Sequence, residues 1–446
     1  MHRTSGPQPA GTLVRLAIVL LTLAQPLRAQ TPPSATERLH ARVLAASPVV
    51  ATQRAAIAVA EARRGLAGLD KPLVLIAGAE EVPGINLLKT GNVRIGIGRD
   101  LVPRARRTAE RAVADEEIAH ERLVLHALEQ ALTVHTNRLL ATSAGSSTIA
   151  ARFAAEDSLL ASAEEAVRSR FSVGDARYVD VLRLRTERLR VQTEMQRAQT
   201  NARIAFRQIV RLVESDSASS AAADVQAALA EEAVRATSAV LAAVPAIDSL
   251  LAGANAVRLA AQEITHARAV QTLAGAQQQP NVTPTIGFQR FTGDNGFRFG
   301  PTLGLSISLP NSVRGARGAQ EALGIREVAF AEARARATTA RIATALAAAA
   351  DRYEAAQARI ASFDATLLRG AREEREAALA SYRSGGLTLL ELLDFERALA
   401  QAEITRMQSR IDAIDARSDL LLIAIGIEEP SGPIDASHGA HMENDR

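Results

Sequence analysis

The residues in this sequence that suggest chemistry are three acids, each placed a few residues after a glycine. Glu391 and Asp394 lie three apart, and Asp180 holds the same place after Gly174 that Glu391 holds after Gly385. Residues three apart share a helical face, so Glu391 and Asp394 would present two carboxylates together. Such carboxylates attract cations, but acids in the first turn of a helix are also favoured by the helix dipole alone. The residues by themselves leave both interpretations open.

Other residues capable of chemistry do not combine into a site. Three histidines on one long helical stretch lack metal-ligand spacing: His120, His126 and His135. Two histidines and a methionine in the tail could hold a soft metal only loosely: His438, His441 and Met442. No nucleophile, base and orienting acid come together. We therefore predict no metal site, no cofactor and no enzymatic activity.

The acids follow two copies of one turn motif. Arg170-Phe171-Ser172-Val173-Gly174 opens the first copy, and Ser381-Tyr382-Arg383-Ser384-Gly385 opens the second, 211 residues later. In each copy a long helical pattern reaches a glycine, and a new helical pattern leaves it. Glycine permits the left-handed backbone that reverses a chain between two helices. The sequence therefore predicts a duplicated helical hairpin.

Composition favours long helices packed closely together. The 446 residues are 47% hydrophobic but only 3% aromatic, and alanine and leucine supply most of the apolar content. The net charge of +3 comes from three arginines in residues 1–29, and the remaining chain is formally neutral. We therefore expect no nucleic-acid partner.

Residues 1–29 are typical of a cleaved secretory signal peptide. A basic start precedes an apolar run, and Leu27-Arg28-Ala29 ends on a small residue. The chain has no cysteine, which excludes disulfides, thiolate metal sites and a lipid-bearing cysteine. No later stretch is apolar enough for a transmembrane helix, so any membrane segment would have to be β-strands.

Two segments change from helical to alternating periodicity. Apolar residues alternate with others over about 73–101 and again over about 282–309, which predicts two β-hairpins. Each hairpin ends at a proline, before a helical stretch of about 70 residues. Weak helix formers at 142–148 predict a kink or a loop in the first stretch, whereas 354–359 is good helix in the second.

The whole chain then divides into an α+β architecture with two repeats. We predict a first repeat over 30–214, a linker over 215–239, a second repeat over 240–427 and a disordered tail over 428–446. Four strands cannot close a barrel, and a lipid-exposed edge is not viable. Three copies would supply about twelve strands, as membrane barrels require. Two small soluble hairpins packed on helices are the alternative.

The order of these elements, with both turn motifs, resembles the TolC family of outer membrane efflux channels. The resemblance covers roughly 39–427 and includes Leu309-Pro310-Asn311 at the exit from the second hairpin. It implies a homotrimer with a twelve-stranded barrel in outer membrane lipid and an α-helical tunnel across the periplasm. It also implies two partners, a periplasmic adaptor protein and an inner membrane pump of the resistance-nodulation-division type.

The resemblance assigns roles to residues of the two turns. Asp180 and Tyr382 match positions of a constricting hydrogen-bond network, while Glu391 and Asp394 match acidic rings at a pore entrance. Adaptor docking is implied for residues on or next to the turns: Val173, Gly174, Gly385 and Leu387. Leu387 stands where a gate arginine can occur in the family, so the gate would be weaker or built differently here.

Three functions remain compatible with the sequence. The first is an exit duct for metal cations or drugs, and the second is a type I protein secretion duct of the same fold. A soluble periplasmic coiled-coil adaptor is the third, although it should carry a compact β domain instead of two separated hairpins.

Overall fold

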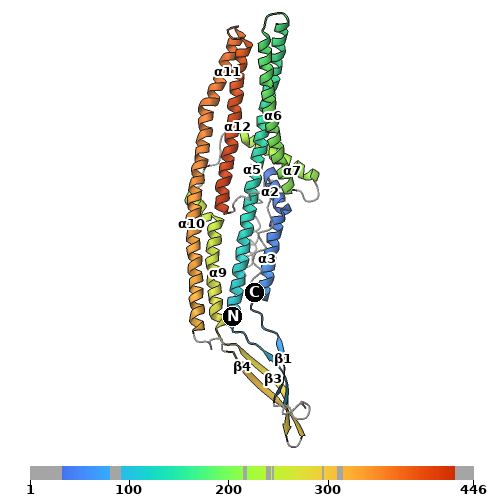
Figure 1. Ribbon diagram of the computed structural model, residues 1–446, viewed down its shortest axis with the longest axis vertical. Helices are drawn as coiled ribbons and strands as arrows, with labels where there is room; N and C mark the ends of the chain where they lie inside the picture. Colours follow the sequence, from blue (N-terminus) through green and yellow to red (C-terminus); the bar gives the residue numbers. More distant parts are fainter. Residues whose placement is uncertain are drawn as a thin grey trace, which may run out of the picture.

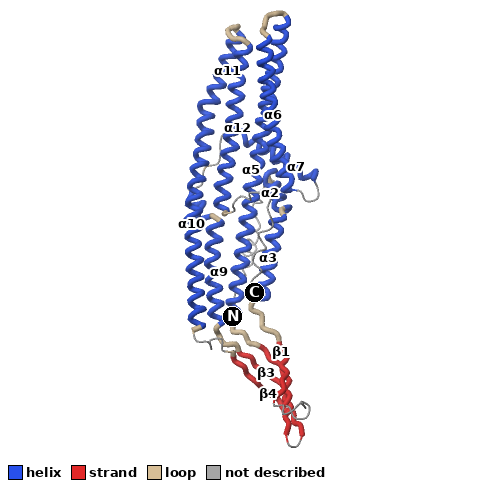
Figure 2. Tube along the Cα trace, viewed as in Figure 1, coloured by secondary structure: helices blue, strands red, loops and turns tan. Residues whose placement is uncertain are grey.

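The computed structural model describes residues 33–80, 92–213, 218–237, 243, 246–293, 296–308 and 315–426. The predicted signal peptide, the start of the linker, the exit from the second hairpin and the predicted disordered tail lie outside these residues. Figure 1 shows an elongated molecule, with helices over most of its length and a small β-sheet at one end. The opposite end is formed by two helical turns (Figure 2).

The elements follow the predicted order of helix, hairpin and helical hairpin, twice. The first half contains α2 (Ala35–Ala46), α3 (Pro48–Leu66), β1 (Leu73–Glu80), β2 (Asn92–Arg99), α5 (Arg104–Ser172) and α6 (Tyr178–Val213). A connecting helix, α7 (Ala218–Thr237), leads to α8 (Ile247–Gly253), α9 (Asn255–Gln277), β3 (Val282–Gly293) and β4 (Gly296–Ile307). The chain then continues as α10 (Ala316–Ser362), a π-helical turn η1 (Phe363–Leu367), α11 (Leu368–Arg383) and α12 (Leu389–Ile425).

Helix α5 runs through both halves of the helical region and contacts most of the other helices. At 69 residues it is about 100 Å long, and it changes neighbours halfway. In the half nearer the sheet the helices lie side by side in the order α3, α5, α9, α10. In the half nearer the turns the order is α6, α5, α12 and then α10 with α11. Towards both ends the wall consists of helices side by side, with α3 and α6 at one edge and α10 at the other (Figure 1), whereas α2, α7 and α8 pack onto it near the middle.

The segment 142–148 is an unbroken part of α5, so a loop there is wrong. Its small residues are explained by close packing on two sides. The Ser143 hydroxyl donates to the Ala202 carbonyl oxygen of α6 at 3.1 Å. A Cβ on Gly145 would lie 2.7 Å from Cδ1 of Ile411 on α12. These weak helix formers thus let α6 and α12 approach α5 closely.

A break in regular α-helix occurs in the second long helical stretch, between α10 and α11, instead. Residues 354–359 are helical as expected, but Phe363–Leu367 forms a π-helical turn directly after them. Asp364 in this turn makes a two-bond ion pair with Arg406 of α12. π-helical turns inside α-helices are often found at functional positions.

The first half of the chain bends at Ser47-Pro48, where α2 ends and α3 begins. The Ser47 hydroxyl accepts a hydrogen bond from the Val50 amide at the start of α3. Helices α2 and α3 meet at an angle of 59°. No single helix in the described part of the chain is long and apolar enough to cross a membrane, although α2 and α3 together meet that test as a bent pair.

The four strands form one antiparallel sheet in the order β1-β2-β3-β4. Its register places rows of matching side chains across all four strands. One row contains Leu75, Ile97, Ile286 and Leu303. The adjacent row on the opposite face contains Ile76, Gly96, Gly287 and Thr302. Strands β1 and β4 are the two edges of this sheet.

Candidate functional site

The first helical turn is built by backbone hydrogen bonds at the end of α5. The Gly174 amide donates to the Phe171 carbonyl oxygen at 3.0 Å, and the Asp175 amide donates to that of Arg170 at 2.9 Å. Gly174 has φ of 81°, a left-handed conformation that side chains with a Cβ disfavour. The Phe171 and Tyr178 rings pack with their centroids 5.6 Å apart.

The second turn repeats this geometry. The Gly385 amide donates to the Tyr382 carbonyl oxygen at 3.0 Å, and the Gly386 amide donates to that of Ser381 at 2.8 Å. Gly385 has φ of 80°. Both turns thus use the same helix-ending motif, in which two amides return to the last turn of the helix. The paired glycine turns expected from the sequence are confirmed.

The predicted acids differ in their surroundings. The Asp180 carboxylate is largely covered and pairs with Arg177 at 3.4 Å. Glu391 belongs to a capping box, in which its carboxylate accepts hydrogen bonds from the Thr388 amide and hydroxyl, each at 2.8 Å. These hydrogen bonds, led by the one from the backbone, lower the pKa of the Glu391 carboxyl. Glu391 therefore has a structural role at the start of α12, whatever further role it has.

Asp394 and Tyr382 are more accessible. The Asp394 carboxylate is 59% exposed and lies 3.4 Å from the Arg397 guanidinium. Tyr382 is 40% exposed. Glu391 and Asp394 are thus both exposed to solvent, and each already has a partner in its own chain.

The residues assigned to docking are only partly exposed. Val173 is 78% exposed, and Gly174 and Gly385 lie at the surface, whereas Leu387 is half-buried. The neighbouring residues Leu389 and Leu390 are partly buried against a core formed mainly by α5 and α6. They therefore add little exposed apolar surface to the second turn.

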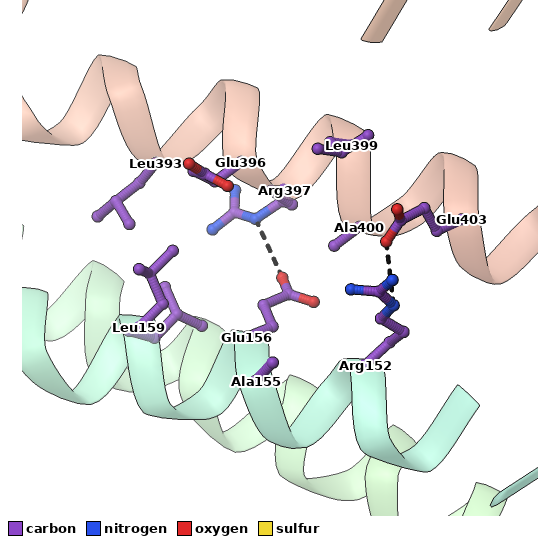
Figure 3. A pocket seen from close by; sticks show the side chains of 11 residues that line it. Arg152, Ala155, Glu156, Leu159, Leu393, Glu396, Arg397, Leu399, Ala400 and Glu403 are labelled. Atoms are coloured by element: carbon purple, nitrogen blue, oxygen red, sulfur yellow. Dashed lines mark ion pairs between the residues drawn. The ribbon is translucent and has the colours of Figure 1, made fainter. Parts of the chain in front are cut away.

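A charged cavity lies between the two helical hairpins, below the tips. It measures about 210 Å³ and is lined by α5 and α12. Arg152 and Glu156 of α5 face Glu403 and Arg397 of α12 across it (Figure 3). The Arg152–Glu403 distance is 3.0 Å, and the Glu156–Arg397 distance is 3.8 Å. No sequence pattern predicts this cavity, because the residues on its two sides are some 240 positions apart and follow no shared motif.

The sheet at the opposite end exposes an apolar face. Its side chains are largely accessible: Leu75 is 70% exposed, Phe288 67% and Leu303 84%. The other face carries small and polar residues such as Gly96, Gly287 and Thr302. Apolar residues exposed on this scale mark a surface that contacts another apolar phase.

Comparison with known proteins identifies this arrangement. No protein-family model and no curated protein sequence match the chain. Solved structures match it along most of its length. The outer membrane protein VceC from Vibrio cholerae is 19% identical with a TM-score of 0.64, covering 88% of this chain and 96% of VceC. The chain has the fold of an outer membrane channel.

Two further channels agree with this fold. The outer membrane channel OprN is 17% identical with a TM-score of 0.64, over 88% of this chain and 90% of OprN. The CmeC outer membrane channel of Campylobacter jejuni is 10% identical with a TM-score of 0.63, over 89% of this chain and 87% of CmeC. The resemblance to TolC-type outer membrane efflux channels is thereby confirmed for the fold.

Within this outer membrane channel fold, the roles of the eight tip residues stay predictions. In one chain, Asp180 pairs with Arg177 of its own turn, and Glu391 with Thr388. Among the described residues, no three or more His, Cys, Asp or Glu side chains are placed to hold a metal ion. His438 and His441 lie outside the described residues.

Proposed function

We propose that this protein is a passive exit duct in the outer membrane, the last component of a tripartite efflux system. The observation that carries the proposal is a four-stranded sheet with an exposed apolar face and two open edges, joined to a wall of helices about 100 Å long. A duct that crosses both a membrane and the periplasm needs both parts.

The apolar face of the sheet supports insertion in lipid. Leu75, Ile97, Ile286 and Leu303 form a continuous exposed row across the four strands. Transmembrane barrels direct apolar side chains outward and small or polar ones inward. The two faces of this sheet differ in that same sense.

The open edges support closure by further copies. Strands β1 and β4 are antiparallel to each other, so β4 of one copy can pair with β1 of the next and keep the antiparallel pattern. Every backbone polar group in lipid needs a partner, which makes closure obligatory. Three copies give a barrel of about twelve strands, within the range of such barrels.

The edges of the helical wall support the same assembly. Exposed apolar residues recur seven apart on the helices at both edges: Val59 and Leu66 on α3, Leu182 and Leu189 on α6, and Leu323 and Phe330 on α10. Seven-residue spacing is the pattern by which helices pack side by side in coiled coils. Copies placed around an axis would cover these residues.

The tips would then meet at the periplasmic entrance. Asp394 and Glu391 from three copies would place six carboxylates near one axis, which favours cations. Val173, Gly174, Gly385 and Leu387 would contact the periplasmic adaptor, which connects the duct to the inner membrane pump. Metal cations and drugs are the proposed cargo. A type I secretion duct is the second candidate, because it shares the fold.

The test is the conductance of the purified protein in planar bilayers, together with its mass in detergent. We expect a complex of three chains and a small cation-selective conductance that a trivalent cation blocks. Glu391→Ala with Asp394→Ala should relieve the block, while Glu374→Ala on the exposed part of α11 serves as the control. A monomer that never inserts would refute the duct and favour the soluble adaptor. Conductance without block would support the duct but show that Glu391 and Asp394 only stabilise the start of their helix.

A further inference from the structure

The contact between the two helical hairpins changes in character along its length. Near the middle of the molecule, Ile149 and Ala150 of α5 pack with Ile404 and Met407 of α12 in an apolar cluster. Close to the tips, Leu393 of α12 joins the core of the first hairpin. Between these two apolar contacts lies the charged cavity (Figure 3). The cavity therefore separates two apolar parts of this contact.

The charges in the cavity are complementary across the two hairpins. Arg152 of α5 pairs with Glu403 of α12, and Glu156 of α5 pairs with Arg397 of α12. Arg397 also lies 3.5 Å from Glu187 of α6. The Arg397 guanidinium thus faces carboxylates from both helices of the first hairpin.

Glu156 is the most covered charge in this group. Its side chain is 9% exposed, compared with 29% for Arg397 and 52% for Arg152. Burial raises the pKa of the Glu156 carboxyl, and Glu187 adds to this, while Arg397 and Arg190 oppose it. An ionised carboxylate in this place is costly, and the largest opposing effect comes from Arg397 on the other hairpin.

We propose that Arg397 is a latch residue, whose positive charge permits the second helical hairpin to close over Glu156 of the first. The latch rests on the proposed function only for its effect on conductance, since the contact itself lies within one chain. Separation of the hairpins would expose the Glu156 carboxylate to water. Closure would bury it, and the Arg397 guanidinium would then have to lie beside it. Arg397 is thus a positioning residue for the closed state of the tips.

A role for the charge of Arg397 can be distinguished from a packing role by a second substitution, at Glu156. Without Arg397, the closed state would bury an unpaired carboxylate, and the hairpins would open more often. Neutralising Glu156 as well removes the charge that needed compensation, so closure should return. Replacing both members of a buried pair is often nearly neutral, whereas removing one is not.

The experiment uses a thiol placed under the contact. The chain has no cysteine, and Leu160 is 2% exposed beside the cavity, so Leu160→Cys reports opening by its rate of maleimide modification. The full-length purified protein in detergent is compared in this background with Arg397→Gln, Arg397→Lys and Arg397→Gln with Glu156→Gln. Arg375→Gln is the matched control, because Arg375 pairs with Glu396 at 2.7 Å inside the second hairpin. Circular dichroism at 222 nm checks that every variant is folded.

We expect Arg397→Gln to raise the modification rate about tenfold and the double variant to return within about twofold of the Leu160→Cys background. Arg397→Lys should lie between them, and Arg375→Gln should leave the rate unchanged. A double variant as reactive as Arg397→Gln would overturn the latch, because Arg397 would then act through packing. An equal rise in Arg375→Gln would also overturn it. The rates require no membrane current, so a protein that fails to conduct can still confirm the latch.

Discussion

Replacement of Gly145 tests why a weak helix segment lies at the middle of α5. A Cβ at this position would lie 2.7 Å from Cδ1 and 2.8 Å from Cγ1 of Ile411, with Sδ of Met407 at 3.7 Å. Gly145→Leu therefore forces α12 away from α5. Gly370 on α11 offers the matched control, because a Cβ there would meet nothing within 4 Å.

The magnitude follows from two opposing effects. Overpacking of a close contact costs about 1–3 kcal/mol. Replacing a helical glycine by leucine gains about 0.8 kcal/mol in helix propensity at either site. Gly145→Leu should therefore lower the free energy of unfolding by up to about 2 kcal/mol, whereas Gly370→Leu should raise it by about 0.8 kcal/mol.

The assay is thermal melting followed at 222 nm at a fixed scan rate. With about 2 °C per kcal/mol for a large chain, the two variants should differ in Tm by about 2–6 °C. Ile411→Ala in the Gly145→Leu background should recover part of the loss, because it removes the atoms nearest to the new side chain. Equal Tm shifts in the same direction for both glycine variants would refute the close-packing explanation.

Two further predictions concern the capping acid and the apolar sheet face. Glu391→Ala should lower Tm more than Glu391→Gln, since glutamine can keep the capping box with Thr388. Because the folded-state pKa of Glu391 is lowered, its contribution is present above the ordinary glutamate pKa and is lost as pH falls through the lowered one, which a Tm series at acidic pH checks. Leu303→Arg should impair insertion into lipid vesicles, and Thr302→Arg should do so much less, because the two residues lie on opposite faces of β4. Equal insertion of the two variants would contradict the assignment of the faces.

Features governed by local rules could be predicted from the sequence. Gly174 and Gly385 end helices in the left-handed conformation, and the alternation around Ile97 and Ile286 gives strands. Both depend on backbone preferences and on a short period that a few residues reveal. The bend before Pro48 also follows from a local preference, since proline is favoured at the start of a helix.

Features that depend on residues far apart could not be predicted. The sequence 142–148 contains poor helix formers, and only the approach of Ile411 explains why small residues are needed there. The π-helical turn around Asp364 depends on Arg406, some 40 residues away. The cavity pairs Glu156 with Arg397 by tertiary packing. For Glu391, by contrast, Thr388 three residues earlier is a capping signal that the sequence alone contains.

Because the two helical hairpins lie side by side, the direction of a force decides how they separate. A force that separates the two tips acts at the end of the contact between the hairpins. It therefore breaks the side-chain contacts between α5 and α12 one after another. Such peeling needs much less force than shearing, in which all contacts along the helices would have to yield together. Peeling from the tips would reach the close contact between Gly145 and Ile411 only after the contacts nearer the tips have separated. Opening at the tips therefore does not require the contacts at the middle of the molecule to separate.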